Sequence, residues 1–210
     1  MLKARIAVLV SGGGTNLQAL IDAEKSGIIK SGTISLVVSN KADAYALERA
    51  RLAGIPAVTL LRKELGSQEA FEAALTKLLE DEDIDLIVLA GFMSILSESF
   101  TRRFKDRIIN VHPSLIPSFC GKGCYGLHVH EKALAYGVKV SGATVHFVTE
   151  ECDAGPIILQ KAVDVLPGDT PELLQRRIME QCEWKLLPRA VSLFCQGRLK
   201  LEGRTVRILD

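Results

Sequence analysis

The feature that most constrains the fold is the regular alternation of short apolar runs with amphipathic stretches in the first half of the chain. Five apolar runs rich in β-branched residues have the length of buried strands. They are Arg5–Val10, Thr33–Val38, Pro56–Leu60, Ile84–Ala90 and Arg107–Val111. The four stretches between them with helical spacing are Asn16–Lys25, Ala42–Ala53, Ser67–Glu80 and about Ser97–Phe104. Strand alternating with helix predicts βαβ units and a parallel sheet.

The second half of the chain follows a different pattern. Ala143–Val148 and Ile157–Val165 are two strand-like runs joined by a short turn-rich link, which favours an antiparallel pair. A helical region begins near residue 170, and Pro188 marks a break in it or the start of another helix. We therefore expect one α/β domain over residues 1–210, with a Rossmann-like, mostly parallel central sheet, antiparallel C-terminal strands and helices on both faces.

The charge balance excludes some classes of partner. Lysine and arginine number 26 and aspartate and glutamate 25, so the formal net charge is +1, and both signs are mixed along the chain. This pattern offers no broad field for nucleic acid or a membrane surface, although one loop can still bind one phosphate. No apolar run approaches the ~20 residues of a membrane helix. The odd number of cysteines, without a disulfide-framework spacing, predicts reduced thiols in a cytoplasmic protein.

A glycine-rich segment, Ser-Gly-Gly-Gly-Thr-Asn at 11–16, stands between the first predicted strand and the first predicted helix. Glycines allow positive φ and close approach of a ligand, and the free N–H groups of a helix start favour an anion. The segment therefore predicts a phosphate site, and the alternative is an ordinary tight turn. It is not a dinucleotide fingerprint, because Leu17 occupies the position of the third glycine, and the Gly-Lys-Ser/Thr of a P-loop is absent.

Polar side chains at the end of the fifth predicted strand form a second candidate site. Asn110 and His112 point to the same face of a strand because side chains alternate. An amide and an imidazole then lie together at the carboxyl edge of the sheet, where ligand sites of α/β folds lie. Asp153 matters only if the fold brings it to His112, where its carboxylate would raise the imidazole pKa and fix the tautomer. The alternative is a histidine satisfied by its neighbours and an ordinary turn aspartate.

No metal site is expected from the sequence. Cys120 and Cys124 resemble half of a zinc site, but no second pair has zinc-like spacing. His128 and His130 flank a single residue, which is too little to indicate a metal. A G-x-S-x-G motif is also absent, so a serine hydrolase is not indicated.

Six stretches, spread over nearly the whole chain, together resemble one family. They are VLVSGGGTNLQALIDA, VVSNKADAYALERARLAGI, LAGFMSIL, INVHPSLIP, SGATVHFVTEECDAGPIILQ and GRLKLEG. They are similar to the phosphoribosylglycinamide formyltransferases, a family of folate-dependent formyltransferases. The resemblance implies that the formyl group of 10-formyltetrahydrofolate passes to the amine of 5'-phosphoribosylglycinamide in purine biosynthesis. It also implies small-molecule substrates, a monomer or homodimer, and no metal, nucleic acid or membrane partner.

The resemblance also implies roles for individual residues. Asn110, His112 and Asp153 match the family's catalytic trio, with His112 protonated and Asn110 also touching folate. The implied binding residues are Gly14, Thr15 and Asn16 for the ribonucleotide phosphate, Glu183 for the rest of that substrate, and Gln68, Met93, Ser94, Ile95 and Leu96 for folate. On this basis a phosphate-binding half covers about 1–105, and a folate-binding and catalytic half covers about 106–210.

The sequence departs from the family at three places. Gln68 and Ser94 stand where some relatives carry arginines, which is expected to alter folate contacts without changing the chemistry. The segment 119–127 is longer than in the shortest relatives. Near Glu183 the chain holds one extra residue, and a one-residue slip turns a helix by about 100°.

Three alternative functions are considered. A methionyl-tRNA formyltransferase is expected to have a further C-terminal domain and a basic surface for tRNA. A formyltetrahydrofolate deformylase usually carries an extra N-terminal domain, whereas here the first predicted strand begins by about residue 5. A non-catalytic nucleotide-binding module has no need of the three polar residues together. The sequence therefore favours the ribonucleotide formyltransferase.

Overall fold

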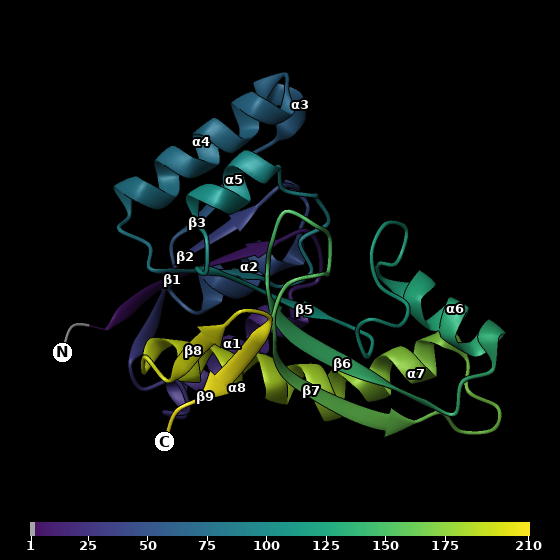
Figure 1. Ribbon diagram of the computed structural model, residues 1–210. Helices are drawn as coiled ribbons and strands as arrows, with labels where there is room; N and C mark the ends of the chain where they lie inside the picture. Colours follow the sequence, from purple (N-terminus) through teal and green to yellow (C-terminus); the bar gives the residue numbers. More distant parts are fainter. Residues whose placement is uncertain (1–2) are drawn as a thin grey trace.

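A single nine-stranded sheet runs through the computed structural model, which describes residues 3–210 (Figure 1). The strands are β1 (Ala4–Val10), β2 (Gly32–Ser39), β3 (Ala57–Thr59), β4 (Leu86–Leu89), β5 (Ile108–His112), β6 (Val140–Phe147), β7 (Ile157–Asp164), β8 (Leu199–Glu202) and β9 (Thr205–Ile208). Their order is β3-β2-β1-β4-β5-β6-β7-β9-β8. The first five are parallel, and β6 and β7 continue the sheet as antiparallel strands. The expected fold class is confirmed.

Helices cover both faces of the sheet. They are α1 (Thr15–Lys25), α2 (Tyr45–Leu52), α3 (Arg62–Leu65), α4 (Gln68–Asp81), α5 (Glu98–Arg103), α6 (Leu127–Tyr136), α7 (Pro171–Ile178), the π-helical turn η1 (Met179–Glu183) and α8 (Trp184–Cys195). In Figure 1, α4 and α5 lie on one side of the sheet, and α1 and α8 lie on the other.

The central strand β1 shows why the first strands are continuous apolar runs. Ile6 and Val8 pack into the core shared with α1 and α8, whereas Ala7 and Leu9 pack into the core shared with α4 and α5. All four side chains are fully buried. A strand covered on both faces needs apolar residues at every position, which is the pattern from which a parallel sheet was predicted.

The structure adds elements that the sequence patterns did not predict, namely α3, α6 and the hairpin of β8 and β9. The interpretation of Pro188 was wrong, because this residue lies inside α8 and begins no new helix. The irregularity lies one turn earlier, in η1. A π-helical turn holds one more residue than an α-helical turn and so absorbs an insertion without ending the helix.

The sheet topology indicates where a ligand is expected. The chain order reverses at β1, which has β2 on one side and β4 on the other. In open α/β sheets ligands bind outside the carboxyl ends of the strands at such a reversal. The loops that follow β1, β4 and β5 meet there. Within residues 3–210, no helix combines the length and the apolar character that crossing a bilayer requires.

Candidate active site

A cavity of about 600 Å³ lies at the carboxyl ends of β4 and β5. Most of the residues expected to form the site line it. These are Asn16, Met93, Ser94, Ile95, Leu96, Asn110, His112, Asp153 and Glu183. Gly14, Thr15 and Gln68 are not among its lining residues. Both halves of the chain contribute to the walls, so the cavity joins segments that are up to about 170 residues apart in the sequence.

The pairing of β5 with β6 brings a second histidine to the polar wall of this cavity. Asn110 lies opposite His146 in the register of the two strands, and its Nδ2 is 3.2 Å from His146 Nε2. His146 Nδ1 is 2.8 Å from the carbonyl oxygen of Phe147, so this nitrogen must carry the proton. In the neutral ring Nε2 then accepts a hydrogen bond from Asn110. This fixes the orientation of the Asn110 amide and leaves its second N–H to donate elsewhere.

His146 was not predicted as a site residue from the sequence. It stands within one of the stretches that carry the family resemblance, but nothing local marks it as different from a core residue. It is 1% exposed, and only the antiparallel register places it opposite Asn110.

His112 lies between two acceptors. Its Nε2 donates to the carbonyl oxygen of Phe119 at 2.9 Å, and its Nδ1 is 3.5 Å from Asp153 Oδ2. Burial lowers the pKa of His112, and the Asp153 carboxylate and the Phe119 carbonyl offset only part of this effect. In the protein without substrates, burial therefore works against the protonated His112 that the family resemblance implies. Its side chain is 5% exposed, and desolvation of the charged ring outweighs the attraction of one carboxylate.

Asp153 is held beside both histidines by the loop between β6 and β7. Its backbone takes a left-handed conformation with φ 54°, and its Oδ2 accepts the Gly121 N–H at 2.9 Å. Its Oδ1 is 3.7 Å from His146 Nε2. Burial alone would raise the pKa of Asp153, but the neighbouring rings of His146 and His112 and the Gly121 N–H lower it to about 2. The carboxylate is therefore ionised at neutral pH.

The glycine-rich loop is tied to α2 by its carbonyl groups. The oxygen of Gly12 accepts the Ala46 N–H at 3.0 Å, and the oxygen of Gly13 accepts Arg49 Nε at 2.7 Å. No side chain caps the N-terminus of α1, so its first N–H groups are open to an anion. Gly14 has φ 70°, and a Cβ there would lie 2.7 Å from the Ala46 side chain. This glycine is required by packing as well as by backbone conformation.

Glu183 reaches the cavity from the π-helical turn η1. It is 6% exposed, and its Oε2 accepts Asn16 Nδ2 at 2.6 Å. Burial raises the pKa of Glu183 to about 7, against the lowering effect of this hydrogen bond. Asn16 Oδ1 is buried and has no hydrogen-bond partner among residues 3–210. Two polar acceptors therefore lie together next to the N-terminus of α1.

The apolar side of the cavity is the loop after β4. Ser94 lines the cavity, and its hydroxyl accepts Asn40 Nδ2 at 2.7 Å. The Met93 N–H donates to the Ser11 hydroxyl at 2.7 Å, which ties this loop to the glycine-rich loop. Gln68 does not reach the cavity, because its amide is engaged by Arg62, Glu72 and the Ile95 carbonyl.

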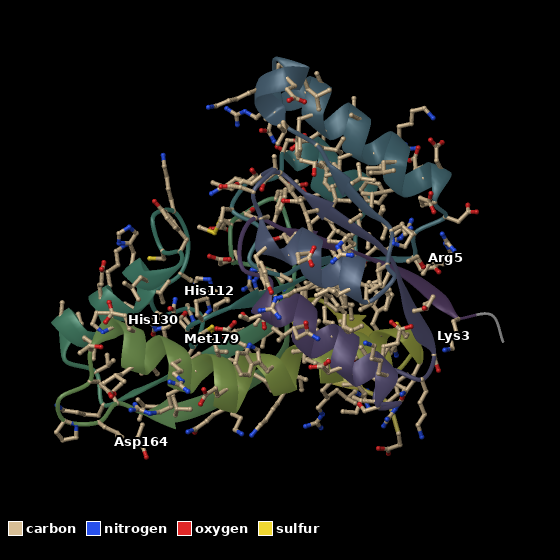
Figure 2. The ribbon with its side chains drawn as sticks, turned by 180° about the vertical axis from the view of Figure 1, so that it is seen from behind. Lys3, Arg5, His112, His130, Asp164 and Met179 are labelled. Atoms are coloured by element: carbon tan, nitrogen blue, oxygen red, sulfur yellow. The ribbon has the colours of Figure 1, made fainter. Side chains whose placement is uncertain are left out.

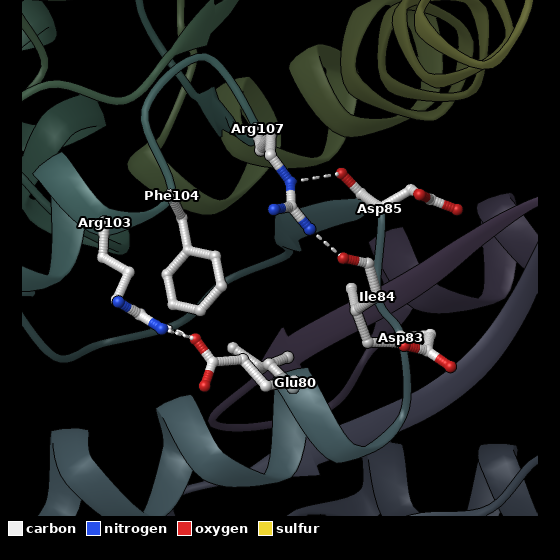
Figure 3. A pocket seen from close by; sticks show the side chains of 8 residues that line it. Glu80, Asp83, Ile84, Asp85, Arg103, Phe104 and Arg107 are labelled. Atoms are coloured by element: carbon white, nitrogen blue, oxygen red, sulfur yellow. Dashed lines mark hydrogen bonds and ion pairs between the residues drawn. The ribbon is translucent and has the colours of Figure 1, made fainter.

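A second cavity, of about 460 Å³, lies at the amino ends of β4 and β5 (Figure 3). Its two guanidinium groups are already engaged within the protein. Arg103 Nε donates to Glu80 at 2.6 Å, and Arg107 Nε donates to the Asp85 carbonyl at 3.0 Å. This cavity has neither a histidine nor an unengaged arginine in its walls, so the larger cavity is the candidate site.

The histidines of α6 do not line the cavity, although His130 lies near enough to His112 for their charges to interact. His128 is exposed and lies 2.7 Å from Glu131, whereas His130 is fully buried and burial lowers its pKa to about 4. In Figure 2, His130 lies to one side of His112. Over residues 3–210, no group of three histidine, cysteine, aspartate or glutamate side chains has a geometry that could hold a metal ion.

Comparison with known proteins identifies the family. The formyl transferase family model matches residues 4–191. The phosphoribosylglycinamide formyltransferase of Escherichia coli K12 is 46% identical over 93% of this chain and 89% of that protein. The human trifunctional purine biosynthetic protein adenosine-3 is 45% identical over 95% of this chain and 19% of that protein. The crystal structure of glycinamide ribonucleotide transformylase 1 from Symbiobacterium toebii matches with a TM-score of 0.93 and 50% identity, covering 99% of this chain and 95% of that one. The chain therefore belongs to the formyl transferase family, among the phosphoribosylglycinamide formyltransferases.

Proposed function

We propose that this chain transfers the formyl group of 10-formyltetrahydrofolate to the amine of 5'-phosphoribosylglycinamide. The products are formylglycinamide ribonucleotide and tetrahydrofolate, in the de novo biosynthesis of the purine nucleotide IMP. The observation that carries this proposal is the polar wall formed by Asn110, His112, His146 and Asp153 in one cavity. Acyl transfer to an amine needs donors for a developing oxyanion and an acceptor for the amine proton, and this wall holds both.

Each residue of the polar wall has a distinct role in the proposal. The second amide N–H of Asn110 donates to the formyl oxygen as negative charge develops. The Nε2 N–H of His112 leaves the Phe119 carbonyl and donates to the same formyl oxygen. Asp153, which is ionised, accepts the amine proton through water and favours the imidazolium of His112, because an opposite charge at this distance stabilises it. His112 gives a proton to the folate nitrogen as the bond from that nitrogen to the formyl carbon breaks. His146 orients Asn110 by accepting its other N–H.

The remaining lining residues divide between the two substrates. We assign the phosphate to Gly14, Thr15 and Asn16, whose loop opens onto the free N–H groups of α1. Glu183 and Asn16 Oδ1 accept N–H groups of the glycinamide. The folate ring packs against the loop Met93–Leu96, and Gln68 supports this loop by donating to the Ile95 carbonyl.

The whole chain is proposed to act as one domain, because a single sheet carries both walls of the cavity. The partners are then the two small-molecule substrates, and light scattering would distinguish a monomer from a homodimer. We place the enzyme in the cytoplasm, since all five cysteines are free thiols. Cell fractionation tests this assignment.

The direct test mixes the purified protein with both substrates and follows the absorbance of folate and the mass of the products. We expect formylglycinamide ribonucleotide to form. Formate released without the ribonucleotide would instead indicate a deformylase, and binding without turnover would indicate a non-catalytic module. His112→Asn should lower kcat by about 10²- to 10⁴-fold, the usual contribution of a positioned acid or base. His128→Asn is the matched control, because His128 lies outside the cavity.

A further inference from the structure

The rim of the cavity beside Met93 and Ile95 is connected to the guanidinium of Arg62 by hydrogen bonds of the Gln68 side-chain amide. Both side chains are exposed, Ile95 by 68%. Gln68 Nε2 donates to the Ile95 carbonyl at 3.2 Å, and Gln68 Oε1 accepts Arg62 Nη1 at 3.0 Å. The amide of Gln68 therefore bridges the backbone of the rim and the guanidinium of Arg62, which belongs to the short helix α3.

A buried carboxylate fixes the orientation of this bridge. Glu72 is 7% exposed, and its Oε1 accepts both Gln68 Nε2 and the Ser97 N–H at 2.7 Å. The Gln68 amide must point its NH₂ group at Glu72 and Ile95, so only its oxygen remains for Arg62. The position of Arg62 beside the rim follows from a defined set of hydrogen bonds.

Arg62 also keeps its charge for a ligand. Across residues 3–210, no carboxylate lies within ion-pair distance of its guanidinium, and its one hydrogen bond is to the neutral Gln68. The exposed Glu69 feels its charge only at longer range. The cation that lines the cavity itself is Lys122, which lies in the segment between β5 and α6. These two residues are the candidates for binding an anion that leaves the cavity.

The formyl donor carries such an anion. Folates end in a glutamate with two carboxylates, and polyglutamate forms carry more. If the reacting nitrogen lies at Asn110 and His112, and the ring packs against the apolar loop, the charged tail must leave through the exposed rim, because burying an unpaired carboxylate is costly. Resting on the proposed function, we propose that Arg62 binds the carboxylates of the folate glutamate tail and so determines affinity for the polyglutamate donor.

The size of the effect follows from the exposure of the site. A solvent-exposed charge pair contributes little and is screened by salt. We expect Arg62→Gln to weaken binding of tetrahydrofolate monoglutamate by about threefold at low salt, and binding of its pentaglutamate by more. The difference from the unmodified protein should shrink as salt is added. The affinity for the ribonucleotide and kcat should not change.

The test is calorimetric titration of tetrahydrofolate and its pentaglutamate, which needs no turnover, together with KM and kcat where the enzyme is active. Lys63→Gln removes the same charge from the neighbouring residue, which makes no hydrogen bond to Gln68, and Lys122→Gln removes the other candidate cation. Equal losses for Arg62→Gln and Lys63→Gln, or a loss confined to Lys122→Gln, would overturn the role of Arg62. A protein that binds folate without transferring the formyl group would refute the proposed function, while the titrations still decide the role of Arg62.

Discussion

Glu183 is a buried hydrogen-bond acceptor of the site, and the ionisation of its carboxyl group lowers the stability of the folded protein. Its pKa is raised by burial from 4.5 to about 7 in the folded protein. A carboxyl group whose folded pKa is raised destabilises the native state as pH rises from the unfolded pKa through the folded one. With 1.36 kcal/mol for each pKa unit, the cost is about 1 kcal/mol at pH 5 and about 3 kcal/mol at pH 8.

Glu183→Gln removes this cost, because glutamine is neutral at every pH and can still accept the Asn16 N–H. The variant should gain stability over the unmodified protein as pH rises. For a chain of this length, the difference in Tm should grow from about 2 to 4 °C at pH 5 to about 6 to 12 °C at pH 8. The same change should raise KM for the ribonucleotide by about tenfold, because a buried acceptor of substrate N–H groups is lost.

The assay is thermal unfolding of both proteins from pH 5 to pH 8.5. Any packing defect in the variant adds a constant offset, so the pH dependence of the difference is the test. Glu180→Gln is the control, since Glu180 lies in the same turn η1 but is exposed and paired with Arg176. A Tm difference for Glu183→Gln that does not change between pH 5 and pH 8 would refute the reasoning.

Three further predictions concern the walls of the cavity. Asp153→Asn should lower the pKa of His112 measured by NMR, since the carboxylate raises this pKa against the effect of burial. It should reduce kcat more than substrate binding, and the ratio of its kcat to that of the unmodified enzyme should recover partly toward pH 5.5. An unchanged His112 pKa would remove the electrostatic role of Asp153. Gly13→Ala should raise KM for the ribonucleotide, since it adds a methyl group to the loop assigned to the phosphate, but it should not alter stability, because the new Cβ meets nothing within 4 Å. Gly14→Ala should lower stability by about 1 to 3 kcal/mol through backbone strain and a clash. Equal losses of stability in the two variants would contradict this distinction. Ser94→Arg should change folate affinity and its salt dependence, measured by titration, because this residue lines the cavity. An unchanged affinity would mean that folate does not bind beside Ser94.

Much of the fold follows from local pattern. The apolar runs of β1 to β5 predict their strands because a strand buried on both faces must be apolar at nearly every position. The relation between Asn110 and His112 is equally local, since the strand period places both on one face. The hairpin of β8 and β9 was missed because its strands are short and half exposed, so they carry little periodic signal.

The sequence by itself determined the fold class, the family and the strand that carries Asn110 and His112, because these depend on side-chain periodicity and on residues close together in the chain. Only the tertiary structure decided that His146 faces Asn110, that a left-handed turn brings Asp153 to His112, and that η1 keeps Glu183 in the cavity. It also decided that burial outweighs Asp153 in setting the pKa of His112. Strand register and desolvation depend on atoms from segments far apart in the chain, and no local pattern contains that information.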